Sequence, residues 1–91
     1  MKYTIKPTSK FQKDLKKAKK RGCDIDELKI IIKTLANGEK LDKKYKDHSL
    51  SGDFQGKREC HINPDWLLIY EQDDDELYLY LVRTGSHSDL F

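Results

Sequence analysis

Residues 65–83 read DWLLIYEQDDDELYLYLVR, and this stretch decides the fold more than any other part of the chain. Two runs of aliphatic and aromatic residues, near 65–72 and 76–83, have the composition and alternation of β-strands. The acidic segment Asp73–Asp75 lies between them and is compatible with a tight hairpin turn. The stretch therefore predicts two adjacent antiparallel strands.

Alternation assigns the side chains of both runs to two faces of the sheet. In the second run, one face holds Leu77, Leu79 and Leu81, and the other holds Tyr78, Tyr80 and Val82. In the first run, one face holds Leu67 and Ile69, and the other holds Trp66, Leu68 and Tyr70. We expect an aliphatic face to pack under helices and an aromatic-rich face to remain partly open.

Two amphipathic helices are expected before the hairpin, over about 9–21 and 25–37. Thr8 or Ser9 can cap the first helix, and Asp24 begins a capping-box pattern for the second. Apolar residues recur at helical spacing in both segments. The first stripe is Phe11, Leu15 and Ala18, and the second is Leu28, Ile31, Ile32 and Leu35.

A short strand over 2–6 and a further strand near 54–61 complete a βααβββ order. This order predicts an α+β fold in which two N-terminal helices pack on a mainly antiparallel sheet. A length of 91 residues leaves room for one core, so we treat 1–91 as a single domain. The long polar connection over 38–53 has the character of a functional loop.

The composition excludes several classes of protein. No run of about 18 apolar residues is present, so we expect no membrane-spanning helix and no membrane partner. The N-terminus has no signal-peptide pattern, so a cytoplasmic location is expected. The spacing of Cys23 and Cys60 fits neither a disulfide scaffold nor a zinc site, and we expect reduced thiols.

The charge is divided unevenly along the chain. Residues 1–46 hold 15 Lys and Arg against 6 Asp and Glu, whereas residues 47–91 hold 3 against 10. A basic half of this kind suits a polyanion such as nucleic acid. Lysines that merely solvate two helices would give the same composition, so both interpretations stay open.

All three histidines lie in short polar segments of the second half, at His48, His61 and His87. Imidazole can act as acid or base near neutral pH, and RNA supplies its own nucleophile in the 2′-OH. Metal-free RNA cleavage therefore suits these residues. A metal site is the chemical rival, but no HxH or HExxH spacing is present.

Four segments give the sequence a family resemblance. They are YKDHSLSG at 45–52, GKRECH at 56–61, PDWLLIY at 64–70 and RTGSHSDLF at 83–91. In combination they resemble the YafQ branch of the RelE/ParE superfamily of type II toxin–antitoxin toxins. The resemblance implies a RelE-like fold and a ribosome-dependent endoribonuclease that cuts mRNA in the ribosomal A site. It also implies a cognate antitoxin of the DinJ/RelB kind, contact with operator DNA only through the antitoxin complex, and no cofactor.

The resemblance also implies which residues form the site. We expect His87 as general acid and Asp65 as base, with His48 and His61 near the phosphate and either histidine as an alternative base. Arg83 would neutralise phosphate charge, and Trp66 and Phe91 would hold bases. Arg83 as a structural cap and Trp66 as a core residue remain alternatives. Exposed lysines would bind the phosphates of ribosomal RNA. These lysines are Lys13, Lys16, Lys17, Lys20, Lys40, Lys43, Lys44 and Lys46.

Glu59 departs from the resemblance, because a shorter Asp is common at this place in the pattern. We therefore leave Glu59 outside the expected catalytic set. Two other functions remain open: a non-nuclease toxin of the same superfamily that acts on DNA gyrase, and an inactive module that binds RNA or antitoxin.

Overall fold

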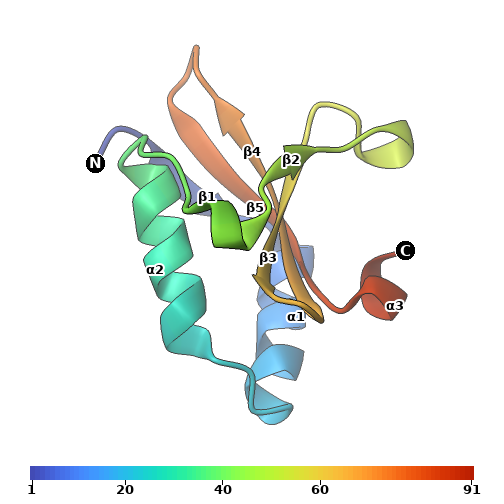
Figure 1. The fold of residues 1–91 in the computed structure, drawn as a ribbon. Helices are drawn as coiled ribbons and strands as arrows, with labels where there is room; N and C mark the ends of the chain where they lie inside the picture. The colour runs from blue at the N-terminus through green and yellow to red at the C-terminus, as the bar shows by residue number, and fades with distance from the viewer.

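A five-stranded sheet organises the computed structural model, which describes residues 1–91 (Figure 1). The strand order is β1-β5-β4-β3-β2, with β1 parallel to β5 and all other pairs antiparallel. The strands are β1 (Thr4–Pro7), β2 (His48–Ser49), β3 (Arg58–Asn63), β4 (Trp66–Asp73) and β5 (Tyr78–Gly85). The helices are α1 (Ser9–Lys20), α2 (Ile25–Ala36) and α3 (His87–Leu90), with 3₁₀ turns η1 (Lys43–Tyr45) and η2 (Gly52–Phe54).

The predicted α+β architecture with two N-terminal helices and a mainly antiparallel sheet is confirmed. Strand β3 begins later than expected, because residues 52–54 form a 3₁₀ turn. The two-residue strand β2 and the short helix α3 are not among the elements predicted from the sequence. Both elements prove central to the site described below.

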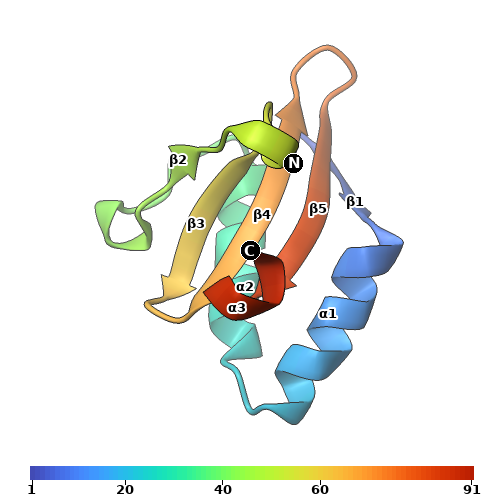
Figure 2. The same cartoon turned by 90° about the vertical axis from the view of Figure 1, so that its right-hand side faces the viewer.

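Both long helices begin at the predicted caps. The Thr8 hydroxyl accepts the Phe11 N–H at 3.1 Å, and the Asp24 carboxylate accepts the Glu27 N–H at 3.1 Å. These bonds satisfy backbone donors that have no partner inside the helix. Figure 2 shows α2 behind the sheet and α3 in front of it. No helix in the structure is long and apolar enough to cross a membrane.

The aromatic residues of β4 face the helices, contrary to the expected open aromatic face. Trp66 and Tyr70 are 3% and 1% exposed and belong to the core beneath α1 and α2. The reason is the strand register, in which Tyr70 pairs with Leu81 and Gln72 with Leu79. Residues paired across an antiparallel sheet share a face, so the aromatic set of β4 joins the aliphatic set of β5.

The opposite face of the sheet carries a smaller apolar cluster. Leu67 and Ile69 of β4 pack there with Leu90 of α3. Leu77 belongs to neither face, because it lies in the β4–β5 turn with a φ of 59° and is 41% exposed. The sheet therefore has one face for the main core and one that is only partly covered.

A β-bulge interrupts the pairing of β4 with β5. Ile69 pairs with Arg83 and Tyr70 with Leu81, so Val82 is an extra residue on β5. A bulge bends the strand that carries it and re-aims the side chains beyond it. The bulge lies in β5, the strand that leads into α3.

The free energy of unfolding should depend on the helix-facing core. Leu68 is completely buried in that core, so Leu68→Ala is expected to cost about 2–5 kcal/mol through lost apolar contact and a residual cavity. Urea unfolding followed by circular dichroism measures the change. Ile30, which is 55% exposed on α2, provides the control, because Ile30→Ala should cost less than about 0.5 kcal/mol. Equal losses in the two variants would contradict the assigned core.

Candidate active site

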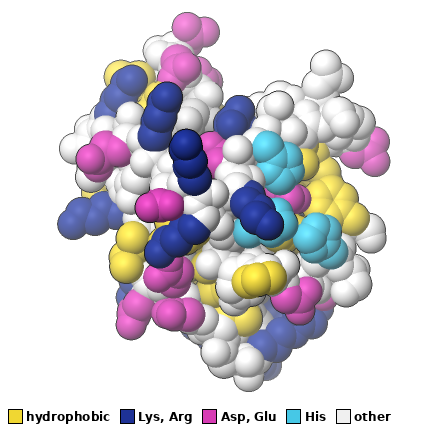
Figure 3. Space-filling model, in the orientation of Figure 1, with side chains coloured by type: hydrophobic (Ala, Val, Ile, Leu, Met, Phe, Trp, Pro, Cys, Tyr) yellow, Lys and Arg dark blue, Asp and Glu magenta, His cyan; other side chains and the backbone are white.

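The three histidines gather on the face of the sheet opposite α1 and α2. His48 comes from β2, His61 from β3 and His87 from the start of α3. The ring centroids of His48 and His61 are 6.1 Å apart, and those of His61 and His87 are 5.8 Å apart. Figure 3 shows the histidine side chains as one patch with basic side chains beside it. The structure thus brings together three residues that are widely separated in the sequence.

A buried carboxylate, Glu59, lies between two of these rings. Its Oε1 is 3.4 Å from His48 Nε2 and 3.5 Å from His61 Nε2. Glu59 is only 3% exposed, and its Oε2 has no hydrogen-bond partner. Glu59 is not in the catalytic set predicted from the sequence. Its spacing of two residues from His61 was the available signal, because residues i and i+2 of a strand share a face.

The backbone before β2 fixes the tautomer of His48. His48 Nδ1 lies 2.7 Å from the carbonyl oxygen of Lys46, and a carbonyl can only accept, so Nδ1 carries a proton. The other ring nitrogen, Nε2, then faces Glu59. Lys46 has a left-handed φ of 50°, which is uncommon for a residue with a side chain and is found often at functional sites.

Asp47 holds this segment on the sheet. Its carboxylate accepts the Tyr70 hydroxyl at 2.6 Å and two guanidinium bonds from Arg58 at 3.3 Å. Charge-assisted bonds of this kind are stronger than neutral ones. The residue that precedes His48 is therefore tied to both β3 and β4.

Burial lowers the pKa of His61, and the charges of His48, His87 and Lys46 lower it further. The nearby Glu59 carboxylate acts in the opposite direction and raises that pKa. The net effect is a His61 ring that favours the neutral form. A neutral imidazole can accept a proton, which is the property that a general base needs.

Two phenylalanine rings, Phe91 and Phe54, form an aromatic wall beside His87. The Phe91 ring lies 6.2 Å from the His87 ring and 5.6 Å from the ring of Phe54, which packs against it edge to face. Phe91 is 62% exposed, so its ring is accessible from the solvent. Phe91 is a site residue predicted from the sequence, whereas Phe54, which η2 brings from a distant part of the chain, is not.

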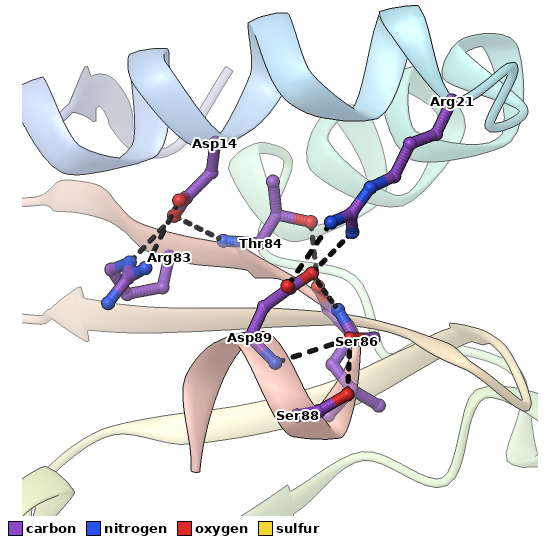
Figure 4. Close-up of polar contacts among 8 residues, drawn as sticks. Asp14, Arg21, Arg83, Thr84, Ser86, Ser88 and Asp89 are labelled. Atoms are coloured by element: carbon purple, nitrogen blue, oxygen red, sulfur yellow. Dashed lines mark hydrogen bonds and ion pairs between the residues drawn. The ribbon is translucent and has the colours of Figure 1, made fainter.

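Three of the predicted site residues lie away from the histidines. Asp65 is exposed in the β3–β4 turn and lines a pocket of roughly 270 Å³ together with Arg21. Trp66 is a core residue, so its ring has no free face for a base. Arg83 donates to Asp14 of α1 at 2.7 and 3.1 Å (Figure 4). These positions agree better with a core residue at Trp66 and a structural contact at Arg83 than with substrate binding by either residue.

The predicted lysines divide into two groups. Lys44 and Lys46 line a pocket of roughly 370 Å³ that also contains His61. Lys40 and Lys43 belong to the same loop, whereas the other four are exposed along α1, which packs on the opposite face of the sheet. The α1 group is Lys13, Lys16, Lys17 and Lys20.

The cluster can also hold a metal ion. One ligand atom from each of His48, Glu59 and His61 lies within 4.8 Å of the others. Two imidazoles and a carboxylate suit copper or zinc. The same groups suit proton transfer, so the geometry alone defines a site of the imidazole–carboxylate class.

Comparisons with known proteins assign this α+β domain. A family model described as "Bacterial toxin of type II toxin-antitoxin system, YafQ" matches residues 3–91. The "mRNA interferase toxin YafQ" of Escherichia coli K12 is 41% identical over 88 residues, covering 96% of this chain and 94% of that protein. The chain therefore belongs to the YafQ family of toxins, and the expected resemblance is confirmed.

Solved structures agree with this assignment. A metal-bound toxin from Helicobacter pylori superposes with a TM-score of 0.92 at 47% identity, covering 98% of this chain and 99% of that one. The toxin of the E. coli DinJ–YafQ toxin–antitoxin complex superposes with a TM-score of 0.89 at 39% identity, covering 100% and 99%. The fold is thus shared over essentially the whole chain.

The acid–base properties of His61 are directly testable by NMR titration. We expect a pKa below the ordinary value of 6.5, and a further fall in Glu59→Gln, which removes the charge that raises it. A pKa lowered by folding means that the unfolded chain binds a proton to His61 more readily than the folded protein does. The contribution of His61 to the free energy of unfolding is therefore fully present above pH about 6.5 and is lost as the pH falls through the pKa of the folded protein. Asp75→Asn, a charge change in the distant β4–β5 turn, should leave the titration unchanged. A His61 pKa that rises in Glu59→Gln would contradict the assigned geometry.

Proposed function

We propose that this toxin is an endoribonuclease that cleaves mRNA in the ribosomal A site by metal-independent acid–base catalysis and so inhibits translation. The observation that supports the proposal most strongly is the convergence of three histidines and Glu59 on one accessible face. The name of the E. coli relative, mRNA interferase toxin, supports the same substrate. Because ribosomes occupy the cytoplasm, the proposal also implies a cytoplasmic location.

The reaction needs a base and an acid on opposite sides of the phosphate. The 2′-OH attacks the adjacent phosphorus while a base removes its proton, and the P–O5′ bond breaks while an acid protonates the leaving 5′ oxygen. The products are a 2′,3′-cyclic phosphate and a free 5′-OH. The ring separation of 5.8 Å between His61 and His87 is compatible with a phosphate held between them.

We assign the base to His61 and the acid to His87. The lowered pKa of His61 favours the neutral ring that a base requires, and Glu59 can stabilise the imidazolium that forms. His87 is exposed beside the aromatic wall and can reach the leaving group. Asp65, the expected base, is not part of this cluster, so its position favours the alternative base named in the sequence analysis.

His48 and the loop lysines would stabilise the phosphate. His48 Nε2 shares the Glu59 oxygen with His61, and Lys46 lies beside His61 in the same pocket. Cations placed where charge develops lower the barrier to phosphoryl chemistry. Phe91, supported by Phe54, would stack on an unpaired base, which contributes roughly 1–3 kcal/mol.

The exposed lysines of α1 would bind ribosomal RNA through its phosphates. Such contacts are insensitive to sequence and weaken steeply with salt. We also propose neutralisation by a cognate antitoxin of the DinJ type, because the E. coli relative is solved in a DinJ–YafQ complex. Contact with operator DNA would then occur only through that antitoxin complex.

Metal binding is a second candidate property of the same residues, favoured by the metal-bound structure of the H. pylori toxin. In this chain His48, Glu59 and His61 supply a suitable donor set. A metal there would occupy the nitrogen lone pairs that proton transfer needs. We therefore propose that a metal inhibits the toxin rather than activating it.

Replacing the acid tests the nuclease mechanism. His87→Ala should lower cleavage of a ribosome-bound mRNA about 10²–10⁴-fold, because no other group protonates the leaving oxygen. Primer extension on a defined transcript locates the cuts, and analysis of the 3′ ends detects the cyclic phosphate. The variant should still bind its antitoxin. Growth arrest that persists without RNA cleavage would instead favour action on DNA gyrase.

The role of the metal is tested by titration of the isolated toxin. Copper or zinc should inhibit cleavage, and EDTA treatment of the toxin before its addition to ribosomes should leave full activity. His48→Asn should weaken metal binding measured by calorimetry. Loss of activity on chelation, restored by the metal, would overturn metal-independent catalysis.

A further inference from the structure

Helix α3 is too short to be stable alone, yet it and the residue after it provide two members of the proposed site, His87 and Phe91. It spans only the four residues His87–Leu90, and Phe91 follows it directly. Isolated helices need about 12–15 residues to form in water. The position of His87 therefore depends on what fastens α3 to the rest of the molecule.

Part of the attachment is local. Ser86 and Asp89 form a capping box, in which the Ser86 hydroxyl accepts the Asp89 N–H at 3.2 Å and the Asp89 carboxylate accepts the Ser86 N–H at 3.0 Å. Leu90 is 8% exposed and packs on Leu67 and Ile69. These contacts shape α3 and press it on the sheet, but they link it only to nearby residues and to one apolar patch.

A second attachment comes from the other end of the sequence. Arg21, the residue directly after α1, donates to both oxygens of Asp89, at 2.6 and 3.3 Å (Figure 4). This forked arrangement fixes direction as well as distance. The Arg21 guanidinium is also the main reason that the pKa of Asp89 lies well below its ordinary value. The carboxylate therefore stays charged at any pH at which the toxin would work.

The backbone is arranged to permit this contact. A Cβ added to Gly85 would lie 3.0 Å from Asp89 Cβ, closer than side chains normally pack. A side chain at this position would push Asp89 away by a few tenths of an ångström, whereas glycine lets Asp89 turn back toward Arg21 without that shift. The glycine at position 85 thus favours the close approach of Asp89 to the end of β5.

Helix α1 makes a similar polar contact with the end of β5, just before α3 in the sequence. Asp14 accepts the Arg83 guanidinium at 2.7 and 3.1 Å and the Thr84 backbone N–H at 3.2 Å. Asp14 and Arg21 are seven residues apart, which is about two helical turns, so they lie on the same side of the helix axis. Two ion pairs of opposite polarity therefore fasten one helix to the end of β5 and to α3, as Figure 4 shows.

We propose that Arg21 is a positioning residue of the nuclease, whose ion pair with Asp89 sets α3 and thereby the place of His87 and Phe91. The inference rests on the proposed function, in which His87 is the acid. Arg21 is not among the residues around the histidines, so it acts through α3. A displacement of about 1 Å in a catalytic group can cost roughly 100-fold in rate, so a small shift of α3 after loss of this contact would be enough to lower activity.

Steady-state cleavage on ribosomes tests the proposal with three variants. Arg21→Ala removes the fork, and Asp89→Asn removes the charge while keeping an oxygen for the Ser86 N–H. Each should lower kcat about 10- to 100-fold with little change in KM. The double variant should fall no further than either single one, because both remove the same contact. Arg21→Lys, which keeps the charge but not the fork, should recover part of kcat.

The controls separate positioning from charge and from stability. Lys33→Ala removes an exposed positive charge from α2, and Asp75→Asn removes a negative charge from the β4–β5 turn; both should leave kcat and KM unchanged. Melting temperatures should show that Arg21→Ala and Asp89→Asn remain folded. His87→Ala measures the acid independently, and its retention of cleavage would overturn the acid role of His87, whereas absence of ribosomal cleavage by the unmodified toxin would overturn the proposed function itself.

Three results would overturn the positioning role while leaving the nuclease intact. One is normal kcat in Arg21→Ala when His87→Ala is inactive. Another is a rise in KM at unchanged kcat, which would make Arg21 an ordinary RNA contact. The last is additive losses in the double variant, which would mean that Arg21 and Asp89 act separately.

Discussion

The burial of Glu59 is the constraint on which the histidine cluster depends. A carboxylate removed from water is costly unless cations or hydrogen-bond donors compensate it. Here one oxygen lies within 3.5 Å of two imidazole nitrogens, and the other has no partner. The two imidazole nitrogens are therefore the nearest polar partners of this buried carboxylate. The same arrangement offers a donor set for a metal ion and the groups needed for the proposed proton transfer.

The two faces of the sheet differ in what they carry: one packs the main core and the other holds the histidine cluster. Its helix-facing side holds a core of fifteen buried residues, whereas its other side holds three buried apolar residues and the histidine cluster. Nearly all hydrophobic stabilisation can thus come from one face, and the second face is free to carry polar groups. The small α3, which packs on that second face, has no deep core of its own. Polar contacts with α1 therefore become important for its position.

Helix α1 takes part in both sides of this division. Phe11 and Ala18 pack in the main core, while Asp14 and Arg21 reach the segment that leads into α3 and the helix itself. Its remaining side carries the exposed lysines proposed for ribosomal RNA. One helix thus connects the core, the surface proposed for the ribosome and the side chain proposed as the acid. For this reason the first quarter of the chain and its last ten residues must be considered together.

The sequence by itself determined the two helices with their caps, the antiparallel hairpin, the family and the three histidines, because periodicity, capping and motifs are local properties. Only the tertiary structure decided that Trp66 is a core residue, that Arg83 is bound to Asp14, and that Glu59 rather than Asp65 lies among the histidines. The physical reason is that alternation gives each strand two faces but does not say which face meets the helices. That choice depends on the register between strands and on the bulge in β5, which join residues far apart in the chain.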